Sequence, residues 1–263
     1  MRGLGGWWLF VAFLALAGWL VFGWLAHGHA PVPARAAPSL RLEAAAGDTV
    51  APAAPTQPPL AGSATAASVV ASVSSDDASL VSVPWAQATS EATGIGYRAL
   101  LGYAGASLAM ASRQPSCHLG WTTLAALGAV ESGHGTHAGS SVDADGVVRP
   151  GIYGPLLDGT ALDAFADTDG GRWDGNAQWD RAVGPLQFIP STWQRWGADG
   201  NGDGINDPQQ VDDAALATGL YLCYSGDLSA AGTWQSAIFS YNHLESYVDA
   251  VAGRANAYAA QVD

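Results

Sequence analysis

The sequence predicts a mainly α-helical domain that follows an apolar N-terminal segment and a long linker. Several segments after residue 93 place apolar residues at helical spacing, and no polar–apolar alternation is long enough to build a large sheet. Residues 3–26 carry no charge, and residues 29–92 are dominated by Ala, Pro, Ser, Thr and Val. We therefore divide the chain into residues 1–28, 29–92 and 93–263.

The N-terminal segment is long enough to cross a membrane. Residues 3–26 would span about 36 Å as a helix, and tryptophans lie near both ends. A transmembrane anchor is the favoured interpretation. A cleaved signal peptide is the alternative, because Ala34-Arg35-Ala36 offers a small-x-small cleavage site. Both interpretations export the rest of the chain.

The linker is expected to be disordered. Seven prolines between residues 31 and 59 interrupt any helix, and no apolar period is present. Residues 29–92 would then tether the folded domain, which begins near residue 93.

Charge excludes several classes of function. The net charge is −13, and all ten basic residues are arginine. A chain without lysine cannot contain a Walker-type phosphate loop or a Schiff-base lysine. No basic stripe is present to displace counterions, so a nucleic-acid partner is not expected.

Periodicity and capping residues predict six helices and one short extended piece. Ser191 is expected to cap one helix, and Asp207 followed by Pro208 is expected to open another. The expected helices cover residues 97–112, 121–132, 191–196, 207–223, 232–241 and 244–261, with an extended piece at 146–149.

Glu131 is the strongest candidate for a catalytic group. On the expected helix 121–132 it lies within about 40° of Leu124 and Leu127, on the apolar stripe. Burial disfavours a charged carboxylate and raises its pKa, which suits a general acid. The alternative is a glutamate at a fraying helix end that turns out to water.

An acidic loop follows the pattern of a calcium site. Oxygen-bearing residues alternate from Asp199, a glycine stands at the sixth position, and the residue after it offers a backbone carbonyl. The twelfth position is Gln210, so the closing carboxylate must come from Asp212 or, preferably, Asp213. The expected ligands are Asp199, Asn201, Asp203, Ile205 and Asp213. The alternative is an acidic turn that binds no cation.

The two cysteines, Cys117 and Cys223, fall in the exported part of the chain. An even count in an oxidising compartment predicts a disulfide. The bond would close a loop of about 106 residues and stabilise the domain by up to roughly 4–5 kcal/mol. Two separate buried thiols are the alternative.

Five motifs, in a fixed order, resemble those of the lytic murein transglycosylases of the membrane-bound type B group, in its actinobacterial form. The resemblance covers about residues 94–263. The motifs are Ala129-Val-Glu-Ser-Gly-His-Gly135, Ala182-Val-Gly-Pro-Leu-Gln-Phe-Ile-Pro-Ser-Thr-Trp193, Asp199-Gly-Asn-Gly-Asp-Gly-Ile-Asn-Asp-Pro208, Asp212-Asp-Ala-Ala-Leu-Ala-Thr218 and Tyr241-Asn-His243. The serine that usually follows the last motif is replaced here by Leu244.

The resemblance implies a lysozyme-like catalytic domain that acts on peptidoglycan. By the match, Glu131 is the catalytic acid, and the acidic loop corresponds to the group's calcium loop, whose last ligand falls at Asp213. The residues expected to contact the glycan are Ser132, Gln187, Phe188, Tyr241 and Asn242.

The implied reaction uses one glutamate and no catalytic cofactor, with Ca²⁺ as a possible structural ion. It would cleave the β-1,4 bond between N-acetylmuramic acid and N-acetylglucosamine and leave a 1,6-anhydro ring. We expect a monomer in the cell envelope, attached to the membrane by its N-terminal segment or secreted. A hydrolytic muramidase is one alternative, and it would need a second carboxylate about 5–9 Å away. A non-catalytic peptidoglycan-binding module is the other.

Overall fold

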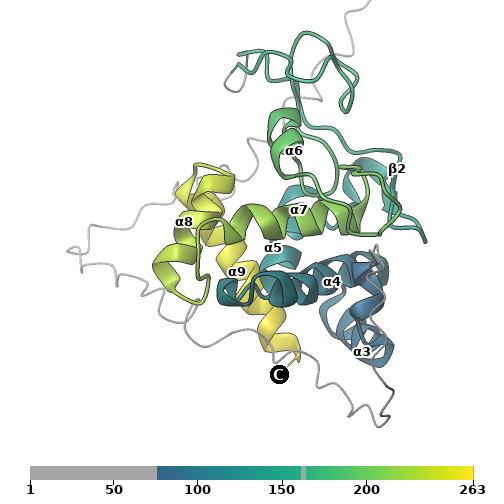
Figure 1. The fold of residues 1–263 in the computed structure, drawn as a ribbon, viewed down its shortest axis with the longest axis vertical. Helices are drawn as coiled ribbons and strands as arrows, with labels where there is room; N and C mark the ends of the chain where they lie inside the picture. Colours follow the sequence, from purple (N-terminus) through teal and green to yellow (C-terminus); the bar gives the residue numbers. More distant parts are fainter. Residues whose placement is uncertain (1–75, 161–163, 263) are drawn as a thin grey trace, which may run out of the picture. The chain divides into compact units, whose positions relative to one another are not determined.

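A computed structural model describes residues 76–160 and 164–262 of the chain. Helices dominate these residues, which confirms the predicted mainly α-helical class (Figure 1). The elements in chain order are η1 (Asp77–Leu80), α3 (Val83–Thr93), α4 (Tyr97–Arg113), η2 (Pro115–Cys117), α5 (Trp121–Ser132), η3 (His137–Gly139), β1 (Ser141–Val142), β2 (Val148–Arg149), α6 (Pro190–Trp196), α7 (Val211–Cys223), α8 (Ala231–Tyr241) and α9 (Glu245–Val262), where η denotes a 3-10 helix. β1 and β2 pair antiparallel, with Val142 opposite Val148.

The core forms around α4, α5 and α7. α4 packs along α7, and the two helices lie side by side in Figure 1. α5 contacts α4, α7 and α9, and its residues from Trp121 to Gly128 are all buried. A Cβ atom at Gly128 would overlap the Tyr103 hydroxyl, so only glycine lets α5 approach α4 this closely. α5 is thus enclosed by the core from Trp121 to Gly128.

The predicted linker extends too far toward the domain. Residues 77–93 form η1 and α3, which pack against α4, and α3 also contacts α9. Pro84 lies in the first turn of α3, where its missing N–H costs no hydrogen bond, and Gly94 ends the helix with φ 72°. The side chain of Ala86 is fully buried. The composition of α3 resembles that of the linker before it, so composition misplaced the boundary at residue 92.

Two predicted helix starts are also wrong. α6 begins at Pro190, with Ile189 as the N-cap, so Ser191 lies inside the helix. α7 begins at Val211 rather than near Asp207. Its N-cap is Gln210, whose side-chain oxygen accepts the backbone N–H groups of the first turn at 2.6 and 2.9 Å. Asparagine, aspartate, serine and threonine are the usual N-caps, so a sequence pattern does not suggest glutamine.

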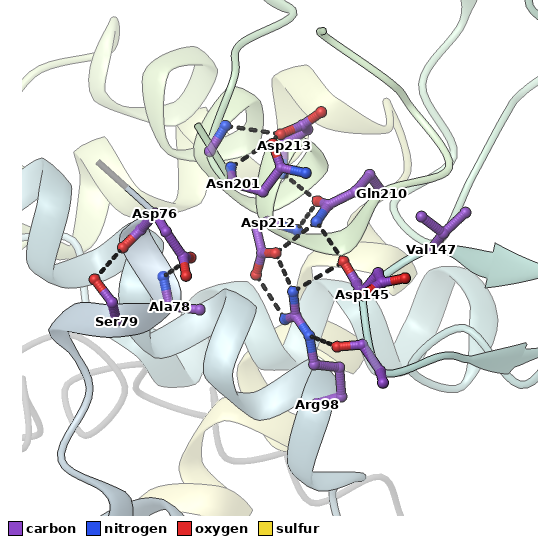
Figure 2. Close-up of polar contacts among 12 residues, drawn as sticks. Asp76, Ala78, Ser79, Arg98, Asp145, Val147, Asn201, Gln210, Asp212 and Asp213 are labelled. Atoms are coloured by element: carbon purple, nitrogen blue, oxygen red, sulfur yellow. Dashed lines mark hydrogen bonds and ion pairs between the residues drawn. The ribbon is translucent and has the colours of Figure 1, made fainter. Parts of the chain in front are cut away.

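Figure 2 shows how the start of α7 is fixed to α4 and to the turn between β1 and β2. Arg98 of α4 forms a two-point ion pair with the fully buried carboxylate of Asp212, with Nη1 donating at 2.8 Å. The same guanidinium donates to the carbonyls of Ala144 at 3.1 Å and Asp145 at 3.3 Å. The Gln210 amide donates to Asp212 at 2.6 Å and to the Asp145 carbonyl at 3.1 Å. Three segments that are distant in sequence thus meet at one buried carboxylate.

The end of α7 is fixed by a disulfide. Cys117 and Cys223 are bonded, with Cα atoms 5.3 Å apart and 106 positions apart in sequence, which confirms the predicted pair. The Gln114 side chain adds a hydrogen bond of 3.0 Å to the Cys223 carbonyl. The bond ties the residues just before α5 to the last turn of α7.

The long segment between β2 and α6 includes an excursion whose two ends meet. The Leu157 N–H donates to the Asp180 carbonyl at 3.0 Å, and the Asp180 N–H donates to the Phe165 carbonyl at 2.9 Å. The Phe165 N–H donates to the Leu157 carbonyl at 2.8 Å. The described part of this excursion touches α6 through Gln194, whose side chain donates to the Thr168 carbonyl at 2.8 Å. The chain therefore leaves and re-enters the domain at nearly the same point.

No helix among the residues described here is long and apolar enough to span a membrane. The predicted anchor at residues 3–26 and most of the predicted linker lie outside the described residues.

Candidate active site

α5 delivers Glu131 to the edge of the core. The helix ends where Gly133 adopts the left-handed conformation, with φ 59°, and its N–H bonds to the Ala129 carbonyl at 3.1 Å. Glycine adopts this conformation without strain, so the sequence itself determines where α5 ends. Glu131 therefore sits in the last turn, where its side chain is partly exposed while the helix behind it is buried.

The Glu131 carboxyl is held by a tyrosine. The hydroxyl of Tyr247, near the start of α9, donates a hydrogen bond to Glu131 Oε1. Burial raises the pKa of Glu131 to about 7, and the Tyr247 hydrogen bond opposes this rise. The apolar position of Glu131 in the sequence predicted the direction of this shift. Near neutral pH the group exists in both protonation states, as a general acid that later acts as a base requires.

Tyrosines from three helices surround this carboxyl. Tyr221 of α7 packs edge-on against Tyr241 at the end of α8, with ring centroids 5.5 Å apart. The Tyr241 hydroxyl donates to the Leu186 carbonyl at 2.6 Å, and burial together with the Glu131 carboxylate raises the Tyr241 pKa. The same two influences raise the pKa of Tyr247. The phenols of Tyr241 and Tyr247 therefore remain neutral beside Glu131.

The Gly-Pro-Leu-Gln-Phe motif is bound directly to the end of α5. Ser132 donates its hydroxyl proton to the Pro185 carbonyl at 2.6 Å and accepts the Gly135 N–H at 2.8 Å. Two hydrogen bonds of 2.9 Å between Val183 and Phe188 close the motif into a tight turn. This turn is therefore attached to the helix that carries Glu131.

Glycine and a strained residue shape that turn. Gly184 has φ 83°, and a Cβ atom there would collide with the Pro208 carbonyl oxygen. Gln187 has φ 50°, an unusual value for a residue with a side chain, and its amide donates to the Gly184 carbonyl at 2.8 Å. Strain of this kind is commonly stored at functional sites.

The five residues expected to contact glycan fall into two groups. Ser132 and Phe188 are buried, and the Ser132 hydroxyl is already engaged by backbone groups, so the structure gives both a packing role. Gln187, Tyr241 and Asn242 are partly exposed. Tyr241 also contacts the motif turn, through its bond to Leu186 and its ring contact with Phe188 at 6.0 Å. Substrate contact by any of the five remains a prediction.

Sequence reasoning missed Tyr247. The residue belongs to none of the five motifs and lies in a helix of ordinary composition. One signal was available, because a buried tyrosine requires a hydrogen-bond partner and Glu131 was the one glutamate expected in the apolar core.

The predicted calcium ligands form a hydrogen-bonded turn in the structure. Asp199 accepts the N–H groups of Gly202 at 2.7 Å and Gly204 at 2.9 Å, and Asp203 accepts that of Ile205 at 2.7 Å. The Asn201 amide donates to Asp203 at 2.9 Å.

Asp213 joins this turn to α7. Its carboxylate accepts the Gly200 N–H at 2.7 Å and the Asp207 N–H at 2.8 Å. Burial raises the pKa of Asp213 to about 7, against these hydrogen bonds, and the nearby Asp199 carboxylate contributes to the rise. Calcium binding by this loop remains a prediction. Such a cation would favour the ionised form of Asp213 and balance the charge of Asp199.

A second acidic cluster lies outside the predicted calcium loop. It consists of three aspartates, Asp167, Asp169 and Asp180, whose carboxylate oxygens lie within 4.8 Å of one another. Among the described residues, this is the group of acidic, histidine or cysteine side chains that converges closely enough to hold a metal ion. Asp180 accepts hydrogen bonds from the Thr168 N–H at 3.0 Å and the Thr168 hydroxyl at 2.6 Å. Sequence analysis did not single out this group.

Comparison with protein families gives a match to part of the chain. Residues 160–238 match the family model described as the Transglycosylase SLT domain. Searches of curated proteins and of solved structures returned no match. The matched segment includes Gln187, Phe188 and the acidic loop from Asp199, but begins after Glu131 and ends before Tyr241. This segment is therefore similar to transglycosylase SLT domains, and the helical architecture is consistent with a lysozyme-like fold.

Proposed function

We propose that this protein is a lytic transglycosylase in which Glu131 is the single acid and base. The proposal rests mainly on one observation: a carboxyl at the end of a buried helix, bonded to Tyr247, whose pKa is raised to about 7. The family match over residues 160–238 supports the reaction class. Glu131 forms no ion pair within the described part of the chain, so no fixed positive charge holds it in the ionised state.

The reaction needs no second carboxylate. Protonated Glu131 donates its proton to the oxygen between N-acetylmuramic acid and N-acetylglucosamine, and the bond from that oxygen to muramyl C1 breaks. The C1 centre becomes oxocarbenium-like, and the N-acetyl oxygen assists it. The Glu131 carboxylate then takes the proton of the muramyl 6-hydroxyl, whose oxygen bonds to C1 and closes the 1,6-anhydro ring. Glu131 ends protonated, and no water is consumed.

The partly exposed residues of the site would orient the sugar. Gln187 stands at the strained position of the motif turn, and Tyr241 and Asn242 end α8 beside it. Orientation of the muramyl ring holds its 6-hydroxyl over C1, which reduces the conformational entropy that the ring closure would otherwise lose.

The exported location of the domain is part of the proposal. The disulfide is typical of an oxidising compartment, where peptidoglycan is found. In this proposal the domain works in the cell envelope as a monomer, held by the N-terminal segment or secreted after its cleavage.

The test uses Glu131→Gln, with Glu245→Gln as the matched control. Gln is nearly isosteric with Glu but cannot donate and then accept a proton, so the variant should lose cleavage of purified peptidoglycan and keep its fold. Glu245 is exposed in the first turn of α9, and its variant should retain activity. Wild-type activity should fall as pH rises past about 7, because the acid must begin protonated.

Product analysis by mass spectrometry separates the alternatives. Anhydromuramyl ends support the proposed reaction, whereas reducing ends would identify a hydrolytic muramidase. Intact glycan bound by wild-type protein would identify a binding module. Cleavage by Glu131→Gln at the wild-type rate would show that Glu131 is not the acid.

A further inference from the structure

Tyr247 reaches the candidate active site from a position fixed by the backbone. It is the third residue of α9, its side chain is buried, and its N–H bonds to the Leu244 carbonyl at 3.0 Å. A short turn joins α8 to α9, with the Leu244 N–H bonded to the Asn242 carbonyl at 2.8 Å. α9 also packs along α5, the helix that carries Glu131. The phenol and the carboxyl are therefore held by two helices in mutual contact.

We propose that Tyr247 is a positioning residue that holds Glu131 Oε1 and thereby reserves Oε2 as the oxygen that gives its proton to the glycosidic bond. This inference rests on the proposed function, because it assigns a reacting atom only if Glu131 is the acid. In the described part of the chain, the hydrogen bond recorded for the Glu131 side chain is the one from Tyr247.

The chemistry of the two groups determines which oxygen carries the proton. A phenol has one proton to donate, and it donates that proton to Oε1. In the neutral acid, the oxygen that accepts a hydrogen bond is the carbonyl oxygen, so the acidic proton belongs on Oε2. Burial and the neighbouring carboxylate raise the pKa of Tyr247, so the phenol stays protonated and continues to donate.

The same hydrogen bond strengthens during the reaction. When Oε2 gives up its proton, Glu131 becomes an anion, and a hydrogen bond to an anion is roughly twice as strong as one to a neutral group. An interaction that strengthens as charge develops lowers the barrier rather than only binding the ground state. Tyr247 therefore contributes to the rate and not to substrate affinity.

The groups around Glu131 do not supply a competing charge. Tyr247 from α9 and Tyr241 from α8 interact electrostatically with the Glu131 carboxyl. Tyr221 from α7 and Tyr103 from α4 in turn interact with Tyr241. The Tyr241 hydroxyl is occupied by the Leu186 carbonyl at 2.6 Å. Tyr247 is thus the phenol placed to act on Glu131.

The experiment compares two variants of the full chain, Tyr247→Phe and Tyr258→Phe. Tyr258 lies on the same helix, but its hydroxyl pairs with His134 at 2.8 Å rather than with Glu131. The pH dependence of kcat and kcat/KM is measured on purified peptidoglycan for both variants and the wild type. Loss of a hydrogen bond to a charged group should lower kcat of Tyr247→Phe about 10- to 100-fold, with little change in KM.

The pH profile separates positioning from a general loss of structure. The Tyr247 bond lowers the Glu131 pKa, so its removal should move the alkaline limb of the profile to higher pH. Tyr258→Phe should keep the wild-type limb. An unchanged limb and near wild-type kcat in Tyr247→Phe would overturn the inference. So would an equal shift in Tyr258→Phe. If Glu131→Gln retained activity, the proposed function itself would fail, which is a distinct outcome.

A second measurement covers the case in which Tyr247→Phe does not fold. The chain has four glutamates, so wild-type protein labelled with ¹³C at the glutamate carboxyl carbons gives a simple spectrum, which Glu131→Gln assigns. The Glu131 carbon should titrate near neutral pH, and a downfield Tyr247 hydroxyl proton should shift with it. In Glu131→Gln this proton should move upfield and lose its pH dependence, because the neutral amide oxygen accepts a weaker hydrogen bond. A hydroxyl resonance insensitive to that titration would overturn the inference.

Discussion

The ion pair at the start of α7 allows a quantitative prediction. Arg98→Met keeps most of the aliphatic volume but removes the guanidinium that contacts Asp212, whose side chain is 0% exposed. Breaking one partner of a buried pair typically costs about 3–5 kcal/mol, because the remaining charge is left buried. For a domain of 150–250 residues each kcal/mol lowers the unfolding midpoint by about 2–4 °C, so a fall of about 6–20 °C is expected.

The assay is calorimetric unfolding with two companion variants. Arg149→Met breaks an exposed pair with Asp143, where the arginine side chain is 69% exposed, and should cost less than about 1 kcal/mol. The double variant Arg98→Met with Asp212→Asn also removes the buried, unpaired carboxylate, so it should recover part of the lost unfolding free energy. Equal falls for Arg98→Met and Arg149→Met would refute the argument that burial of Asp212 makes this pair important.

Two further predictions concern the fixed end of α7 and the acidic loop. Removing the disulfide as Cys117→Ala with Cys223→Ala should cost about 4–5 kcal/mol in the loop-entropy model, measured by urea unfolding, and a loss below about 1 kcal/mol would contradict that model. Calcium at 100 times its dissociation constant should stabilise the domain by about 2.7 kcal/mol through the loop at Asp199. An unfolding midpoint that is the same in calcium and in excess chelator would show that this loop is only an acidic turn.

The sequence predicted the helices well where apolar residues and glycine acted together. Burial of α5 and its end at Gly133 both follow from residues local to that helix. The cysteine pairing also followed, because two cysteines allow one disulfide. Local information failed at α3, whose alanines and serines match the preceding linker and whose burial depends on α4 and α9.

The candidate site was predictable only in part, for a related reason. Glu131 could be identified because it is an acidic residue on the apolar stripe of its own helix, which is a local signal. The partner of Glu131 lies 116 positions later on another helix, and the link between Tyr247 and Glu131 is set by how α9 packs on α5. The N-cap Gln210 could not be predicted for the same reason, because its side-chain amide donates a hydrogen bond to the carbonyl of Asp145, which is distant in sequence.

The hydrogen bond between Leu157 and Asp180 makes the chain between them replaceable by a segment of another length. The ends of the excursion are hydrogen-bonded to each other, and Leu157 is buried where it departs. A change of length between them leaves the spacing of the two anchor points unaltered, and loop-closure entropy rises only slowly with length. A longer or shorter segment can therefore be grafted there without redesign of the helix that carries Glu131.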